Sequence, residues 1–250
     1  MNFCPILFTR RHAFAVLLLA WLCGCLPILA ELQNAETEVI LSNSGDYFDT
    51  DANLPAPVTP SSFIGAYVHL HRIAVPSDPL EKRLADIEAA VATARRAGIT
   101  VLMPYVADSA GRAYYPSTHH PENLYGDWDA AGAFIATARK AGMAVYPTVP
   151  VLVSGHEEPR GILEKHPEWA LRNEAGKKYG FISPANTEAR AWVVGALNEL
   201  VARYKLKGVT LDYVRYPNRP MMLDEASMAA YNEATGGAPY TVNDRGDTPY

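Results

Sequence analysis

The sequence predicts an α/β fold, a (β/α)8 TIM barrel of which about the first four strand–helix units are present. Short apolar runs alternate with helical patterns from Phe63 onward, and this alternation is typical of a parallel sheet with right-handed crossovers. A dinucleotide-binding open sheet would carry a glycine-rich turn after its first strand, where this chain has His69-Leu70-His71. The loops after the strands carry Tyr, His, Trp and Pro, and barrels build their sites from such loops.

The first unit is an expected strand at residues 64–70 followed by a helix. Ser77 or Asp78 is expected to cap this helix with Pro79 at its first position, and Gly98 is expected to end it. Its predicted buried stripe is Leu80, Leu84, Ile87, Val91 and Ala94.

The later units repeat this plan with predicted strands at residues 100–106, 144–150 and 209–214. One helix is expected from near Asp127 to Gly142, and the next from near Asn186 to Gly208. The predicted buried residues of these helices are Trp128, Ala131, Phe134, Ile135, Ala138, Val193, Val194, Leu197, Leu200, Val201 and Tyr204.

After the fourth strand, the sequence predicts only a weak helix at residues 224–234. A complete barrel has eight strands, so we expect residues 63–250 to be a barrel domain truncated at its C-terminus. On this interpretation the chain is an incomplete fragment of a longer protein.

The first thirty residues are predicted to be an export signal. Arg10, Arg11 and His12 precede an apolar run at residues 13–22, which is shorter than the roughly 20 residues of a membrane-spanning helix and fits a secretory signal peptide. Cleavage is expected either after Ala30 or before Cys25, which would then carry lipid. Residues 31–62 are expected to form a flexible linker, because they hold Ser/Asn/Gly and Pro-rich stretches.

Export predicts a periplasmic, outer-membrane lipoprotein or secreted location, with membrane attachment through a lipidated Cys25. All three cysteines lie in the predicted signal, so cysteine nucleophiles and thiolate metal sites are excluded from the mature chain. The net charge is −5, which argues against nucleic-acid binding through a basic field. We expect no cofactor, no metal and no protein partner.

The strongest local signal is the segment from Gly208 to Pro217, in which a buried strand ends in a carboxylate. Strand alternation places Thr210 and Asp212 on the face opposite Val209, Leu211 and Tyr213. If the apolar set meets the helices, Asp212 points into the barrel mouth, and Arg215 is expected to keep it ionised. Asp212 is therefore the candidate catalytic carboxylate, and a purely structural Asp–Arg pair is the alternative.

At this segment the sequence resembles the glycosyl-hydrolase-like family 10 of exported bacterial proteins. The resemblance runs from about Phe63 to the end of the chain. It rests on several motifs in family order, namely Tyr114-Tyr115-Pro116-Ser117, Asp127-Trp128, Ala141-Gly142-Met143, His166-Pro167-Glu168-Trp169-Ala170-Leu171, Gly176-Lys177, Ser183-Pro184-Ala185-Asn186-Thr187-Glu188-Ala189-Arg190 and Leu211-Asp212-Tyr213-Val214-Arg215-Tyr216-Pro217.

The resemblance implies a (β/α)8 barrel that hydrolyses O-glycosidic bonds of a polysaccharide such as peptidoglycan glycan strands. The family's acidic residue at the end of strand four corresponds to Asp212. The chain departs from the family because the second half of the barrel is missing, and with it any carboxylate those strands supply. The full-length parent is therefore expected to be the enzyme, and the fragment to be inactive.

Aromatic residues near the strand ends are the candidate substrate-binding residues. Tyr67, Tyr105 and Tyr146 occupy similar places in the first three strands and could stack on sugar rings, although packing in the core is the alternative. His69, Tyr213 and Arg215 complete this candidate set.

Two other functions remain open at this point. The chain could be a non-catalytic carbohydrate-binding protein. Alternatively, His69 and His71 end the first strand with one residue between them, which resembles the metal-binding pair of amidohydrolases.

A reporter fused to residues 1–35 is expected to be secreted or membrane-bound, because Arg10 and Arg11 precede an apolar run of secretory length. Cell fractionation would measure this. If Cys25 is acylated, Cys25→Ser abolishes membrane retention, and retention that survives the substitution would contradict lipidation.

Overall fold

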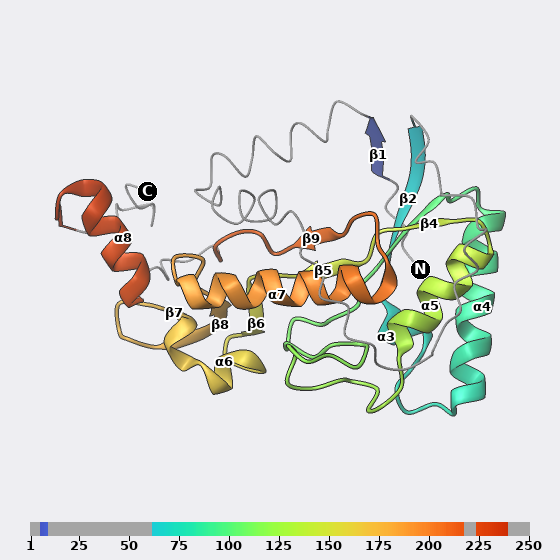
Figure 1. Ribbon diagram of the computed structural model, residues 1–250, viewed down its shortest axis with the longest axis horizontal. Helices are drawn as coiled ribbons and strands as arrows, with labels where there is room; N and C mark the ends of the chain where they lie inside the picture. The colour runs from blue at the N-terminus through green and yellow to red at the C-terminus, as the bar shows by residue number, and fades with distance from the viewer. Residues whose placement is uncertain (1–5, 10–61, 218–223, 240–250) are drawn as a thin grey trace.

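The computed structural model describes residues 6–9, 62–217 and 224–239 as a mixed α/β fold (Figure 1). The predicted signal, the linker and Cys25 lie outside these residues, except that Ile6–Thr9 (β1) and the end of the linker at Ser62 are placed in strands. Within the described parts of the chain, no helix is long and apolar enough to cross a membrane.

Parallel strands form the centre of the fold, and neighbours in space follow the order of the chain. β2 pairs with β3 and β3 with β4, all parallel, while β5 pairs in parallel with β9. A parallel bridge between Tyr105 and Thr148 connects these two groups, and β1 adds to the outer edge of β2 in antiparallel orientation. The strands are β2 (Ser62–Val68), β3 (Val101–Pro104), β4 (Ala144–Val145), β5 (Thr148–Pro150) and β9 (Thr210–Asp212).

The strands are shorter than the sequence predicts. The first ends at Val68, and Leu70 begins a short helix, α3 (Leu70–Ile73). The expected strand at residues 144–150 is divided into β4 and β5 at Tyr146 and Pro147, where proline lacks the N–H that a continuous ladder requires.

The two faces of these strands bury different side chains. One face joins the main core beneath the helices, through Ala66, Leu102 and Val145. The opposite face carries a smaller cluster of Val101, Met103, Ala144, Phe63 and Tyr146. Val209 and Leu211 pack against the main core as predicted, which leaves Thr210 and Asp212 on the other side. Tyr213, predicted to share the face of Val209 and Leu211, packs against a separate cluster instead.

Three long helices cover the first face: α4 (Leu80–Arg96), α5 (Ala130–Lys140) and α7 (Thr187–Tyr204). The left-handed glycines predicted to follow the first two are confirmed, since φ is +77° at Gly98 and +76° at Gly142. The first two residues of the buried stripe predicted for α4 are wrong. Leu80 and Leu84 are 47% and 41% exposed, and the buried residues of this helix begin at Ile87.

Two expectations about helix ends are corrected. α4 begins at Leu80 after Pro79, with no side-chain cap, and Asp78 instead forms an ion pair with Lys82 at 3.0 Å. α7 ends at Tyr204, followed by Lys205 as a left-handed C-cap with φ of 49°, rather than at Gly208. Gly208 instead lies close to the ring of Tyr146, and a Cβ there would be 3.3 Å from that ring, which is tighter than ordinary van der Waals contact.

Asp129 connects two of the helices. Its carboxylate Oδ1 accepts from the N–H of Gly132 at 2.7 Å and so caps α5. The same oxygen accepts from the hydroxyl of Tyr204, at the end of α7, at 2.7 Å. Asn186 caps α7 in the same way, accepting from the N–H of Ala189 at 2.9 Å, and its side chain has no second partner among the described residues.

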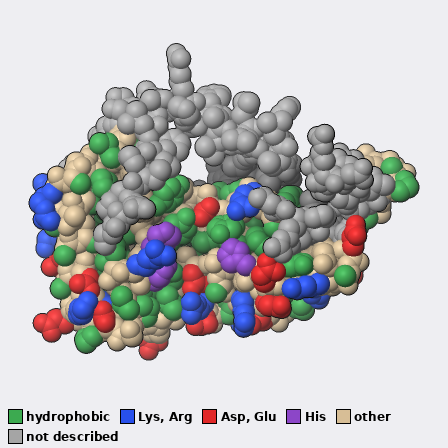
Figure 2. All heavy atoms as spheres, turned by 180° about the vertical axis from the view of Figure 1, so that it is seen from behind, with side chains coloured by type: hydrophobic (Ala, Val, Ile, Leu, Met, Phe, Trp, Pro, Cys, Tyr) green, Lys and Arg blue, Asp and Glu red, His purple; other side chains and the backbone are tan. Residues whose placement is uncertain are grey.

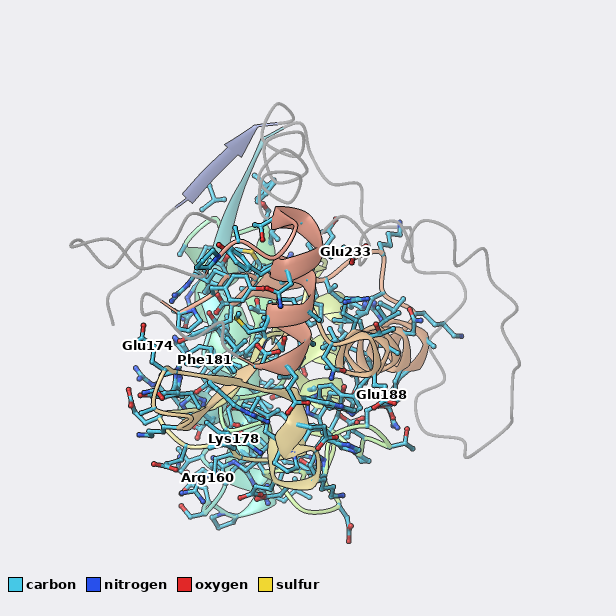
Figure 3. All side chains as sticks on the ribbon, turned by 90° about the vertical axis from the view of Figure 1, so that its left-hand side faces the viewer. Arg160, Glu174, Lys178, Phe181, Glu188 and Glu233 are labelled. Carbon is cyan, nitrogen blue, oxygen red and sulfur yellow. The ribbon has the colours of Figure 1, made fainter. Side chains whose placement is uncertain are left out.

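A small antiparallel sheet between β5 and α7 is a feature that the sequence analysis missed. Its strand order is β6 (Val153–His156), β8 (Lys178–Ile182) and β7 (Ala170–Arg172). α6 (Ile162–Lys165) and a 3-10 turn at Pro167–Trp169 lie between β6 and β7. Figure 3 views this end of the molecule, with Phe181 and Lys178 of β8 labelled above Arg160. The predicted weak helix is confirmed as α8 (Glu225–Thr235), capped by Asp224.

Asp129→Ala is expected to lower the free energy of unfolding by about 2–3 kcal/mol, because it removes a helix cap and leaves the Tyr204 hydroxyl without its partner. Asn186→Ala is the matched control, which removes a cap alone and is expected to cost about 1 kcal/mol. Denaturant unfolding measures both. Equal losses for the two variants would show that the Asp129–Tyr204 hydrogen bond contributes nothing to stability.

Candidate functional site

Asp212 is the last residue of β9, and each of its carboxylate oxygens accepts a hydrogen bond. Oδ2 accepts from the hydroxyl of Tyr105 at 2.7 Å, and Oδ1 accepts from the backbone N–H of Tyr213 at 2.8 Å. The side chain is half-buried, so it is held in place and still reaches solvent. The two hydrogen bonds fix the orientation of the carboxylate plane, because rotation of the plane would break at least one of them.

The register of the parallel strands brings Tyr105 and Asp212 together. Tyr105 forms a bridge with Thr148, and Thr148 pairs with Thr210. Asp212 is two residues beyond Thr210, so it lies on the same face of the strand. The Tyr105 side chain therefore reaches across β5 to the carboxylate at the end of β9.

Side chains in and directly after β2 pack against the ring of Tyr105. The imidazole of His69 stacks on it with 4.9 Å between ring centroids and only 2° between their planes. The Tyr67 ring lies 6.1 Å away, tilted by 33°. Burial and the hydrogen bond to Asp212 raise the pKa of Tyr105 well above its ordinary value, so its hydroxyl stays protonated and continues to donate.

The expected ion pair between Arg215 and Asp212 is wrong. Within the described residues Arg215 pairs with no carboxylate, and its guanidinium carbon lies 5.2 Å from the centre of the Tyr213 ring. The cause is the backbone of Tyr213, whose φ of 55° is left-handed and turns the chain directly after the catalytic candidate. The donor that holds Asp212 is instead Tyr105, which the sequence analysis assigned to sugar stacking.

Tyr213 packs against the small sheet rather than into the site. Its partners there are Val153, Tyr179 and Phe181, and the ring of His156 meets it edge-on at 5.5 Å. His156 also has a left-handed backbone, with φ of 61°. Non-glycine residues in this conformation are strained and cluster at functional sites, and here two of them touch beside Asp212.

The two histidines that follow β2 have different partners. His71 Nδ1 lies 3.1 Å from the hydroxyl of Tyr114, whereas His69 stacks on Tyr105. Partial burial, helped by the charge of Arg72, lowers the pKa of both imidazoles. Among residues 6–9, 62–217 and 224–239, no three His, Cys, Asp or Glu side chains are grouped as a metal site would require.

Tyr67 and Tyr146, the other expected sugar-binding tyrosines, differ in exposure. Tyr67 is 41% exposed, and burial together with the charge of Asp212 raises its pKa. Tyr146 is half-buried and packs against Val101, Met103 and Ala144, which matches the packing alternative. Figure 2 shows two groups of histidine side chains on one face of the molecule, with hydrophobic side chains between them.

Three other carboxylates near the loops have separate surroundings. Asp108 accepts from the backbone N–H groups of Ala110 and Arg112 and forms an ion pair with the Arg112 guanidinium at 2.7 Å. Glu158 is exposed and lies 3.7 Å from Lys177, and Glu157 is exposed as well. Asp108 is thus held by groups of its own loop, and Glu157 and Glu158 are exposed to solvent.

Comparisons with known proteins identify several similar sequences and structures. A family model described as "Glycosyl hydrolase-like 10" matches residues 85–247. An S-layer-related protein from Niallia circulans is 23% identical over 145 residues, which cover 50% of this chain and 9% of that protein.

Two solved structures have the same TM-score of 0.49. Alpha-L-fucosidase isoenzyme 2 from Paenibacillus thiaminolyticus is 19% identical, and the match covers 70% of this chain and 26% of that one. A hypothetical protein from Ruminiclostridium thermocellum is 17% identical, with 69% and 92% covered. The chain thus spans only a small part of the S-layer-related protein and of the fucosidase.

Proposed function

The chain belongs to the glycosyl hydrolase-like 10 family, and we propose on this basis that the protein hydrolyses O-glycosidic bonds of a polysaccharide with Asp212 as a catalytic carboxylate. The single observation that carries the proposal is the placement of Asp212. It is a half-buried carboxylate at the end of a parallel strand, and it accepts hydrogen bonds at both oxygens.

The proposed fold is the first half of a (β/α)8 barrel. The supporting feature is the order of the parallel strands, in which β2, β3, β4 with β5, and β9 follow one another in space as they do in the chain. Helices cover the outer face, and Asp212 lies at the carboxyl end of β9. Barrel enzymes place their catalytic groups at these ends.

The proposed role of Asp212 is anionic. A general acid needs an apolar pocket that keeps it protonated, whereas Asp212 meets two hydrogen-bond donors. An ionised carboxylate can act as a nucleophile or a base towards a transition state with oxocarbenium character. Asp108 and Glu158 are held by Arg112 and Lys177, so neither is proposed as the second carboxylate.

The proposed substrate is a glycan such as the glycan strands of peptidoglycan. Tyr67 and His69 expose aromatic rings beside Asp212, and such rings can stack on sugars. Arg215, supported on the Tyr213 ring, offers guanidinium donors at the same strand end. An exported, envelope location with possible lipidation at Cys25 is part of the proposal and rests on the sequence alone.

Asp212→Asn in the protein that contains this chain is expected to lower glycan turnover on the order of 10³-fold or more. Asparagine keeps an acceptor for the Tyr213 N–H and a donor for the Tyr105 hydroxyl, so the fold should survive while the charge is lost. Steady-state cleavage of purified glycan strands is the assay, and a thermal melt is the check on folding.

Glu158→Gln is the matched control, because it removes one exposed negative charge on the surface and should leave turnover unchanged. Near-parental turnover by a well-folded Asp212→Asn variant would overturn the catalytic assignment. If the parental protein binds the glycan and never cleaves it, it is instead a carbohydrate-binding protein.

A further inference from the structure

We propose that Tyr105 is a positioning residue, which fixes the Asp212 carboxylate in one orientation by donating a hydrogen bond to Oδ2. As a statement about catalysis, the inference rests on the proposed function of Asp212. It replaces the sequence-based assignment of Tyr105 to sugar stacking, because the structure directs its hydroxyl to the carboxylate at 2.7 Å.

The direction of this hydrogen bond follows from the chemistry of its two partners. An ionised carboxylate can only accept, whereas a phenol hydroxyl can donate. Tyr105 must therefore supply the proton, and it can do so only while it is itself protonated. Burial and the neighbouring negative charge raise the pKa of Tyr105, so the donor persists across the neutral range.

Contacts around the Tyr105 ring direct its hydroxyl towards the Asp212 carboxylate. His69 lies parallel to one face of the ring at 4.9 Å, and the backbone N–H of Tyr105 donates to the carbonyl of Val68 at 2.9 Å. A sugar cannot stack on the face that His69 covers. The contacts that hold the ring thus suit it for orienting Asp212 rather than for binding substrate.

The second donor completes the orientation of the carboxylate. The left-handed turn at Tyr213 directs its backbone N–H back to Oδ1 at 2.8 Å. With one oxygen fixed by the backbone and the other by Tyr105, rotation of the carboxylate plane would break at least one hydrogen bond. Of the two donors, only the Tyr105 hydroxyl is a side chain that substitution can remove.

The first test measures the coupling without any substrate. Fluorotyrosine is incorporated into the full chain, and its ¹⁹F signals are titrated with pH by NMR, with the Tyr105→Phe spectrum identifying the Tyr105 signal. Asp212→Asn removes the negative charge and the carboxylate acceptor, so it should lower the pKa of the residue at 105. Glu158→Gln removes a distant charge and should leave that titration unchanged. Identical titration in the parental chain and in Asp212→Asn would overturn the proposal.

The second test uses turnover. Tyr105→Phe should lower kcat by roughly 10-fold or more, as expected for loss of a hydrogen bond to a charged group, with little change in KM. The loss should fall on kcat, because a carboxylate that is free to rotate matters most in the transition state and little for glycan binding. Glu158→Gln, which removes an exposed surface charge, should leave both kcat and KM unchanged.

The two tests separate the failure of this inference from failure of the proposed function. A coupled titration in a protein that cleaves no glycan supports Tyr105 as the residue that positions Asp212 and rejects only the glycosidase. Cleavage with a kcat that is the same in Tyr105→Phe and in the parental protein rejects the positioning role alone.

Discussion

The site depends on the parallel register that places Thr148 between Tyr105 and Thr210. This register aligns Tyr105, directly after β3, with Thr210 at the start of β9. Asp212 is two residues further on the same face, so a tyrosine and an aspartate more than a hundred residues apart can share a 2.7 Å hydrogen bond. A slip of one residue would turn either side chain to the opposite face. The backbone pairing therefore determines which groups surround Asp212.

The helices maintain this register from the outer face. The strand residues of that face share one core with α4, α5 and α7. Asp129 joins the start of α5 to the end of α7 through the Tyr204 hydroxyl, and the chain after α7 leads directly into β9. Gly208 permits the approach of Tyr146 on the way. Helix packing and the position of Asp212 are thus linked through a short segment of chain.

The sequence could predict those features that have local causes. Gly98 and Gly142 end helices because only glycine adopts their backbone conformation easily, and alternation was enough to place Asp212 opposite Leu211. Prediction failed where tertiary contacts decide. Leu80 and Leu84 follow the helical period, yet within the described residues the helix packs against the core only from Ile87 onward.

Two features of the site also escaped prediction because they depend on distant pairing. Arg215 is close to Asp212 in sequence, but the left-handed turn at Tyr213 places its guanidinium over an aromatic ring. The small sheet of β6, β8 and β7 has irregular register at both of its pairings, so its short strands lack a clear alternating pattern. Its signal in the sequence was limited to motifs of the family.

The central claim is that the carboxylate held by Tyr105 faces the glycan. The most direct measurement is a crystal structure of the protein with a bound glycan oligosaccharide. The account predicts a sugar ring within hydrogen-bond distance of Asp212 and in contact with the exposed ring of Tyr67. An oligosaccharide bound at another surface, with Asp212 untouched, would contradict it.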